Sequence, residues 1–388
     1  MARAAGIAIQ EGITCLACPA LSPRCHDFQH SRFAMSRQID CLLPAQTHRV
    51  SETAPPYPQR RRFLQRAGTA MFAGGAVHVF GAASALTLGD DARAATSPLT
   101  LRIGYQKSST LIVLAKARGT LAHALAPHNV TLTWHEFTSG LPLLEALNVG
   151  SIDFSADVAD TVPVFAQAAG ARIAYVARET PSPDAEAILV PQNSPIKTLA
   201  DLKGKRIAVT KGAGVHYLLI AALQSVSLRI NDVQPAYLTP ADARAAFASG
   251  NVDAWVTWDP FLAGIERQDK VRTLTSARGL AGYQRYYLAT PAFARDHDAV
   301  LREVYRTLRE TGQWVRANPR DAAAQLAPLW GLDTATVEAA NRRRSYDVQP
   351  VVRDAIAEQQ RIADAFTQAG LLPRRVDAAD ATFWQPPA

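Results

Sequence analysis

Short apolar strands alternate with amphipathic helices along this chain from Leu99 onward. In each unit an apolar strand leads through a turn of small residues into a helix, as LTLRIGYQ leads toward TLIVLAKARG and GKRIAVTKG leads into VHYLLIAALQ. The spacing of the apolar residues changes from about two in the strands to about 3.6 in the helices. This alternation predicts an α/β fold with parallel, or nearly parallel, sheets.

The series of units is interrupted near AEAILVPQNSP and then restarts. Two sets of units predict two α/β lobes with a cleft between them, and a chain of 388 residues that is 48% hydrophobic suffices for two cores. QRYYLATPAF is predicted to return the chain to the first lobe, and a mostly helical C-terminal segment follows from Asp296. We place lobe I in residues 95–184 and 284–388, and lobe II in residues 185–283.

The N-terminal region has the pattern of an export signal. Arg60 and Arg61 are followed by Arg62-Phe-Leu, a weakly apolar run, and a small-residue site ending at Ala94. Residues 59–94 are therefore predicted to be a twin-arginine signal peptide, which implies a periplasmic protein. A membrane anchor is disfavoured, because four glycines and a histidine interrupt the run. Residues 1–58 are either a disordered leader or the product of a start assigned too far upstream.

The cysteines and the charge limit the possible functions. Cys15, Cys18, Cys25 and Cys41 all precede the cleavage site, so the exported chain lacks a disulfide and a cysteine nucleophile, and nothing completes a zinc site. The net charge of +7 falls to +3 after residue 94, because residues 1–94 hold 10 Arg and 6 acids. We therefore expect no nucleic acid, metal or cofactor, and we interpret the run Arg342 to Arg344 as a solvated helix end.

The candidate binding residues lie in turns that follow strands. These turns are QKSST (106–110), SADVADT (155–161), KGAG (211–214) and TWDPF (257–261). Ligands gather beyond the carboxyl ends of parallel strands, where the free N–H groups of helix N-termini suit an anion. Motifs of hydrolases and metalloproteases are absent from the sequence, so we predict a binding protein and not an enzyme.

Several residues in these turns also have a purely structural interpretation. Asp157 and Asp160 are most simply a turn residue and a helix N-cap, and Asp259 is an N-cap before Pro260 at the first helical position. His216, off the apolar face of its helix, is expected to be solvated or hydrogen-bonded, with ligand contact as the alternative. That apolar face consists of Val215, Leu218, Leu219, Ala222 and Leu223.

Longer segments of the chain carry a family resemblance. They include LRIGYQK, ALNVGSIDF, PVFAQAAGA, ILVPQNSPIKTLADLKGKRIAV and YLTPADARAAFASGNVDAWVTWDPF. From Leu99 to Pro373 the chain resembles the aliphatic-sulfonate-binding proteins of ABC importers. The resemblance implies a type II periplasmic-binding-protein fold, a small anionic ligand such as an alkanesulfonate, and delivery of that ligand to permease subunits in the inner membrane. We expect the receptor to be a monomer.

The resemblance also implies where the ligand binds. By position, Gln106 matches the family's glutamine after the first strand, residues 213–216 match its anion-facing helix start, and Trp258 with Asp259 match its cleft wall. The chain departs from many relatives in the longer SADVAD turn and in Ala213 and Gly214, where serines are common. The candidate ligand contacts are Gln106, Ser155, Ala156, Asp157, Asp160, Gly212, Ala213, Gly214, Val215, His216, Trp258 and Asp259.

The chemistry of a sulfonate suggests how such a site would work. A sulfonate is always ionised and offers only acceptors, so we expect a neutral cradle of backbone N–H groups, with Lys211 as a further candidate donor. Because the hydroxyl donors of the relatives are missing, taurine, a sulfate ester or nitrate remain alternative ligands. A desulfinase-type enzyme on the same fold and a sensor lobe are further alternatives. The known enzymes of that type use a cysteine, which the exported chain lacks.

Overall fold

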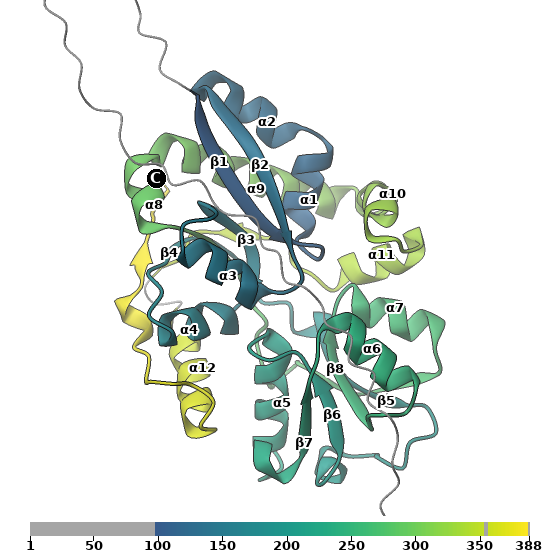
Figure 1. Cartoon of the computed structure of the whole chain (residues 1–388). Helices are drawn as coiled ribbons and strands as arrows, with labels where there is room; N and C mark the ends of the chain where they lie inside the picture. Colours follow the sequence, from purple (N-terminus) through teal and green to yellow (C-terminus); the bar gives the residue numbers. More distant parts are fainter. Residues whose placement is uncertain (1–97, 353–355, 387–388) are drawn as a thin grey trace, which may run out of the picture. The chain divides into compact units, whose positions relative to one another are not determined.

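The computed structural model describes residues 98–352 and 356–386, which form two mixed sheets with helices around them (Figure 1). The predicted signal peptide and the segment before it lie outside the described residues. Within the described part of the chain, all strands of the first set of units join one sheet, and all strands of the second set join the other. The predicted two-part α/β architecture is thus confirmed.

The larger sheet has seven strands in the order β11-β4-β10-β3-β1-β2, with β12 beside β4. Its strands are β1 (Leu99–Gln106), β2 (Val130–Phe137), β3 (Phe154–Ala159), β4 (Ala174–Glu179), β10 (Arg285–Ala289), β11 (Val348–Gln349) and β12 (Thr382–Phe383). β1 is parallel to β2 and β3, whereas β10 is antiparallel to β3 and β4. The reversal arises because β10 enters this sheet on its return from the smaller one, as QRYYLATPAF predicts.

The smaller sheet has five strands in the order β7-β6-β8-β5-β9. They are β5 (Glu186–Pro191), β6 (Arg206–Val209), β7 (Gln234–Tyr237), β8 (Ala254–Trp258) and β9 (Val271–Ser276). β6 is parallel to β7 and β8, and β5 is antiparallel to β8 and β9. Both sheets are therefore mixed: the expectation of parallel, or nearly parallel, sheets holds for β1 with β2 and β3 and for β6 with β7 and β8, whereas β5, β10 and β11 pair in the antiparallel direction.

Helices flank both sheets (Figure 1). Those of the first set are α1 (Thr110–Ala117), α2 (Thr120–Leu125), α3 (Gly140–Asn148) and α4 (Thr161–Ala168), and those of the second are α5 (Gly214–Gln224), α6 (Pro240–Ala248) and α7 (Phe261–Gln268). Short 3-10 helices precede some of the strands: η1 (Ala126–His128), η2 (Pro183–Ala185), η3 (Leu199–Leu202), η4 (Ile230–Asp232) and η6 (Ala378–Asp380). None of the helices in residues 98–352 and 356–386 is long and apolar enough to cross a membrane.

The predicted helical C-terminal segment is confirmed. It consists of α8 (Pro291–Asp296), α9 (Asp298–Ala317), α10 (Pro319–Trp330), α11 (Thr334–Arg342) and α12 (Ala357–Gln368). α9 packs on α1 and α2, whereas α11 packs on α7, and α12 packs on both α4 and α5. The C-terminal helices therefore contact helices of both sheets, and the chain leaves α11 beside the ends of β3 and β4.

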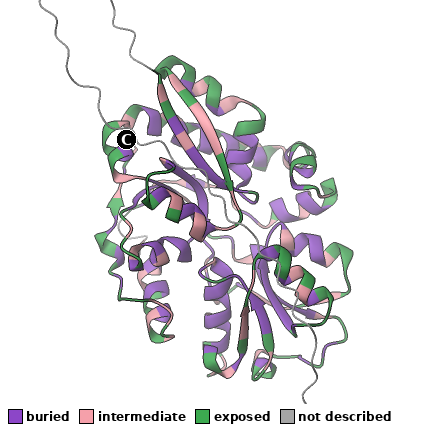
Figure 2. Ribbon diagram, in the orientation of Figure 1, coloured by how far each residue is buried: buried purple, intermediate pink, exposed green. Residues whose placement is uncertain are grey.

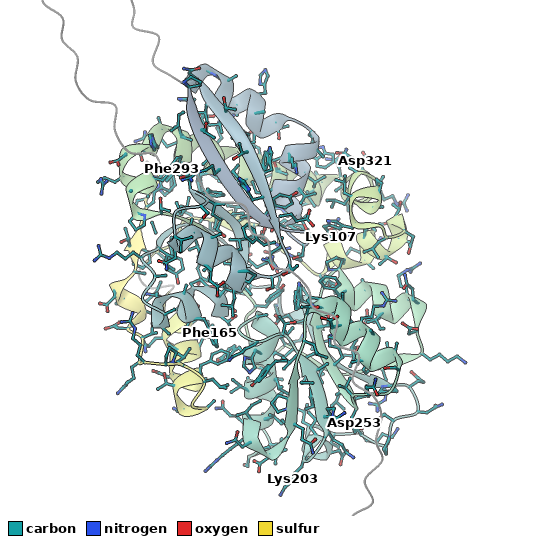
Figure 3. All side chains as sticks on the ribbon, in the orientation of Figure 1. Lys107, Phe165, Lys203, Asp253, Phe293 and Asp321 are labelled. Carbon is teal, nitrogen blue, oxygen red and sulfur yellow. The ribbon has the colours of Figure 1, made fainter. Side chains whose placement is uncertain are left out.

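The central strands β3, β5, β8 and β10 form the buried interior, whereas the outer strands β2, β7 and β9 are partly exposed (Figure 2). One continuous apolar cluster includes side chains from both sheets, among them Tyr175, Ile188, Val209 and Leu218. The predicted apolar face of α5, Val215 to Leu223, is fully buried in this cluster. Figure 3 shows Lys107, just past the end of β1, on the side of the larger sheet that faces the smaller one. The shared apolar cluster thus holds the two sheets together, with the ends of their central strands toward each other.

Candidate functional site

A small cavity lies where the two sheets meet. Its lining residues come from both sides: Gln106, Ser139, Gly140, Ala159, Val162 and Arg285 from the larger sheet and its helices, and Glu186, Ala213, Gly214, Trp258 and Tyr283 from the smaller sheet and the return crossing. Its volume is about 20 Å³, and a water molecule needs roughly 10 to 15 Å³ by the same measure. The cavity therefore holds about one water, and a larger ligand requires the walls to separate.

The larger hollows found among the described residues are not lined by strand ends of both sheets. The largest, about 480 Å³, is lined by Gln167, Pro291, residues before β4 and the segment around Arg374. It contains no residue from the smaller sheet or from a helix start that follows one of its strands. We therefore take the small cavity between the sheets as the candidate site, because it is lined by strand ends, and by the helix starts that follow them, from both sheets.

The wall from the larger sheet begins at the end of β1. Gln106 is buried there, and its Nε2 donates a hydrogen bond to the carbonyl oxygen of Asp157 at 3.2 Å. Its backbone N–H donates to Ser109 Oγ at 3.1 Å, which fixes the turn before α1. Gly140 at the start of α3 packs against Val162, whose Cγ2 would lie 2.7 Å from an added Cβ. This wall is consequently rigid, and its side chains have little freedom to move into the cavity.

The opposite wall is the first turn of α5. Ala213 is the N-cap, and Gly214 opens the helix. A Cβ on Gly214 would collide with Oε1 of Glu186 and lie 3.0 Å from the ring of Tyr283. The first N–H groups of a helix lack intrahelical acceptors and carry partial positive charge. Gly214 therefore brings bare backbone close to the cavity, as the sequence predicts.

Arg285 provides the fixed positive charge of the cavity. Its side chain is 3% exposed and forms an ion pair with Asp157. Its Nη1 donates to Tyr283 Oη at 2.6 Å, and its Nη2 donates to the Asp157 carbonyl at 3.1 Å. The sequence analysis did not predict this guanidinium, which lines the cavity while Asp157 balances its charge. The signal for it was an arginine at the start of the otherwise apolar strand RYYLA.

Arg344 shows that part of the basic run was also misinterpreted. Its side chain is 3% exposed and pairs with Glu179 at 2.6 Å and Asp157 at 3.1 Å. Burial opposes its charge, but these carboxylates raise the pKa of Arg344 well above its ordinary value. Of the three arginines predicted to be solvated, only Arg342 is exposed, at 68%, while Arg343 pairs with Asp259 and Glu266. The run ends inside the molecule because the chain turns inward after α11.

Glu186 is a cavity residue that the sequence reasoning missed. It begins β5 and is 1% exposed. Within residues 98–352 and 356–386, neither of its carboxylate oxygens has a hydrogen-bond partner. Burial, and secondarily the nearby Asp160, raise the pKa of Glu186 well above its ordinary value, while Arg285 acts in the opposite direction. The signal, an acid opening the apolar run EAILVP, was visible but resembled an ordinary strand start.

The three predicted acids lie outside the cavity lining. Asp157 is in β3 and not in a turn, since the strand continues to Ala159. Asp160 is the predicted N-cap of α4: it accepts from the N–H of Thr161 at 3.0 Å, and also from that of Gln284 at 2.9 Å. Burial raises its pKa to about 7. Asp160 thereby connects the start of α4 to the segment at Gln284, which returns the chain to the larger sheet.

Asp259 caps a helix that begins later than predicted. α7 starts at Phe261 with Pro260 as N-cap, so Pro260 is not the first helical residue. The Asp259 carboxylate nevertheless accepts from the N–H of Ala263 at 3.0 Å and pairs with Arg343 at 3.4 Å. Burial raises its pKa to about 7, and Arg343 partly opposes this shift. Its partner in the predicted pair, Trp258, does line the cavity.

His216 is buried, and not solvated. It is fully enclosed between the rings of Phe366 and Tyr237. Its Nδ1 accepts from the Gly212 N–H at 3.2 Å, so the prediction of a hydrogen-bonded residue holds. Burial, followed by Lys211, lowers the pKa of His216 to about 4. The ring is therefore neutral at pH 7 and closes the turn before α5.

The structure brings together only some of the predicted contacts. Gln106, Ala213, Gly214 and Trp258 line the cavity, whereas Ser155, Ala156, Asp157, Asp160, Gly212, Val215, His216 and Asp259 do not. Several of the latter support the lining: Gly212 O accepts from Thr161 Oγ1 at 2.8 Å, which joins the starts of α4 and α5. Ser155 Oγ instead donates to the adjacent Ala156 carbonyl at 2.8 Å. Within the described part of the chain, no cluster of His, Cys, Asp and Glu could hold a metal ion.

Comparison with known proteins identifies the family of this chain. Residues 129–322, half of its length, match the family described as NMT1/THI5 like. An Escherichia coli protein described as an aliphatic sulfonates-binding protein is 43% identical over 294 residues, which cover 76% of this chain and 91% of that protein. The chain belongs to the NMT1/THI5-like family. A Bacillus subtilis protein described in the same way is 29% identical over 72% of this chain and 84% of its own length.

Solved structures of similar proteins support the fold assignment. The periplasmic aliphatic sulphonate binding protein SsuA from E. coli aligns with a TM-score of 0.69 and 43% identity, over 75% of this chain and 94% of that one. SsuA from Xanthomonas axonopodis pv. citri, bound to MOPS, aligns with a TM-score of 0.70 and 42% identity, over 75% and 99%. The predicted periplasmic-binding-protein fold is thereby confirmed. The desulfurization enzyme DSZB, at 16% identity, shares the fold alone.

Proposed function

We propose that the protein is an exported receptor that captures an aliphatic sulfonate between its two lobes and delivers it to the permease of an ABC transporter. The observation that carries the proposal is the convergence of Arg285, Gln106 and the first turn of α5 on one cavity. All three present donors, and a sulfonate presents only acceptors. The E. coli and Xanthomonas relatives that are described as sulfonate-binding proteins share 43% and 42% identity with this chain.

Arg285 is the proposed anchor of the sulfonate head. Hydrogen bonds to a charged group are worth roughly 1.5 to 3 kcal/mol each. The pairing of Arg285 with Asp157 holds its guanidinium in place before a ligand arrives, so little side-chain entropy is lost on binding. The N–H groups of Gly214 and Val215 would complete the oxygen ligation from the opposite wall. Of the two, Gly214 lines the cavity and Val215 follows it in the helix.

The apolar part of the lining would receive the carbon chain of the ligand. Val162, Ala159 and the ring of Trp258 provide this surface. Trp258 is 6% exposed and packs edge-on against Phe261 at the start of α7. The α5 turn has Ala213 and Gly214 where serines are common in relatives, so this turn would offer backbone N–H groups and not hydroxyl groups to the head of the ligand.

The remaining parts of the proposal concern the whole receptor. Residues 59–94 would export it as a twin-arginine signal peptide, and it would act as a periplasmic monomer. Lobe I would comprise residues 95–184 and 284–388, and lobe II residues 185–283, in line with the strands of the two sheets. The relatives cited above are described as binding proteins, and not as enzymes.

Calorimetric titration tests the proposal. The wild-type protein should bind 1-butanesulfonate and quench or shift the fluorescence of Trp258, a change that Trp258→Phe abolishes. Arg285→Lys keeps the charge but loses the planar fork, and we expect at least a tenfold loss of affinity. Arg278→Lys is the matched control, because Arg278 is 72% exposed and pairs with Asp184 away from the cavity. A wild-type protein that binds nitrate, taurine or a sulfate ester but no alkanesulfonate would contradict the proposal.

A further inference from the structure

The carboxyl group of Glu186 is enclosed in the candidate site without any partner. The residue is 1% exposed, and neither oxygen accepts or shares a hydrogen bond within residues 98–352 and 356–386. Oε1 lies against Gly214 in the first turn of α5, where the proposed ligand would bind. Burying an ionised carboxylate without donors costs several kcal/mol or more. Its position in the cavity therefore requires either a cation, a donor, or a proton.

The neighbours of Glu186 do not supply the cation. Arg285 shares the cavity, but its guanidinium already pairs with Asp157 and donates to Tyr283. The other acid that acts on Glu186 is Asp160, at the start of α4, and its charge adds to the repulsion. Tyr283 on the return crossing and Trp258 on β8 bring no positive charge to it. Arg285 therefore lowers the pKa of Glu186 through its charge, but within the described residues it forms no hydrogen bond to that carboxyl group.

The charge balance of the site leads to the same conclusion. Behind the cavity, Arg285 and Arg344 face Asp157 and Glu179 in one buried network, so two positive charges meet two negative ones. An ionised Glu186 would leave this region with surplus negative charge and would repel a sulfonate. A neutral Glu186 removes the repulsion, and its O–H becomes a donor within a site that must supply donors.

We propose that Glu186 is a ligand-binding residue that is protonated in the bound state and donates its O–H to an oxygen of a monoanionic sulfonate. This inference rests on the proposed function. The proton comes from solvent and stays on the carboxyl group, and the sulfonate remains ionised throughout. When the ligand-free protein is open and Glu186 meets water, the carboxyl group ionises. Closure around the anion then takes up one proton.

The direction of the pKa shift agrees with this geometry. Burial raises the pKa of Glu186 in the closed structure well above its ordinary value. A ligand that binds only the protonated form loses affinity as pH rises through the pKa of the free protein, by up to about tenfold per pH unit. Because the sulfonate itself does not titrate in this range, the dependence reports on the protein.

Calorimetry from pH 5 to pH 9 with 1-butanesulfonate tests the inference. It is performed in sulfonate-free buffers of different ionisation enthalpy, such as imidazole and Tris, so that proton uptake can be measured. The wild type should lose affinity at the alkaline end and take up as much as one proton there. Glu186→Gln, a neutral donor of the same shape, should bind with a weaker dependence of affinity on pH and without proton uptake by that residue; the dependence that remains is expected from Asp160, whose pKa burial raises to about 7. Glu145→Gln is the control, since Glu145 is exposed on α3.

Two results would overturn the inference while leaving the proposed function intact. The first is wild-type affinity that does not change between pH 5 and pH 9. The second is tighter binding of taurine than of ethanesulfonate, with that preference lost in Glu186→Gln, because Glu186 would then be ionised and pair with the ammonium group. If the wild type binds no sulfonate at any pH, the proposed function itself fails, and the two failures are thus distinguished.

Discussion

At the residue scale, the side chain of Glu186 and the ring of Tyr283 leave no space for a methyl group on Gly214. Gly214 is not in a left-handed conformation, since the residue of positive φ in this turn is Gly212. Gly214 is required for another reason: the backbone of α5 must approach the cavity closely. The sequence predicted this role correctly from the glycine at a helix start, although it could not identify the side chains that crowd it.

Gly214→Ala should therefore weaken both ligand binding and folding. The added methyl displaces Glu186 or Tyr283, and we expect at least a tenfold loss of affinity for 1-butanesulfonate. Overpacking of this kind costs about 1 to 3 kcal/mol of stability. The control is Gly264→Ala in α7, where the nearest atoms to an added Cβ are 3.9 Å away, so the free energy of unfolding should rise by about 0.4 to 1 kcal/mol. Calorimetry and urea unfolding measure both; equal affinities of Gly214→Ala and wild type would refute the close approach.

At the scale of elements, the segment after α11 connects the C-terminal helices to the site. Arg344 leaves this helix and reaches Glu179 at the end of β4 and Asp157 in β3, and Asp157 also holds Arg285. Tyr346, two residues further on, is buried and bonds to Thr110 at 3.1 Å and to Asn341 at 2.7 Å. Arg344 thus helps to position Arg285 through their shared partner Asp157, although neither Arg344 nor Tyr346 lines the cavity.

Arg344→Ala should destabilise the protein strongly, because it leaves Glu179 buried without its arginine. Loss of one partner of a buried ion pair costs about 3 to 5 kcal/mol. Arg342→Ala, two residues earlier, removes an exposed pair with Glu338, and such a change costs about 0.5 kcal/mol or less. Chemical unfolding of both variants measures the contrast. Similar losses in the two variants would show that the buried network contributes little.

The elements that the sequence predicted well are those with a strong period. The apolar face of α5 and the long helix α9 have clear helical spacing, and both are present as expected. The sequence could not predict pairing over long separations. Asp157 looked like a turn residue because it is polar, but Arg285 and Arg344, 128 and 187 residues away, allow it to lie within a buried strand. Only the folded chain brings these charges together.

At the scale of the whole molecule, the cavity of about 20 Å³ is too small for any sulfonate, since a single water fills it. Binding therefore requires the two walls to separate and close again around the ligand. The hydrogen bond between Thr161 Oγ1 and the Gly212 carbonyl, which joins the starts of α4 and α5, is a contact that has to break or adjust. The sequence predicted two lobes with a cleft, but not that Arg285 and Glu186 would line it.

The most direct test of the central claim is a crystal structure of the protein with 1-butanesulfonate. We predict the sulfonate oxygens at hydrogen-bond distance, about 3 Å, from the Arg285 guanidinium and from the backbone N–H of Gly214, with the butyl chain against Trp258. A sulfonate bound at the larger hollow near Arg374, or one that contacts neither Arg285 nor α5, would contradict the account.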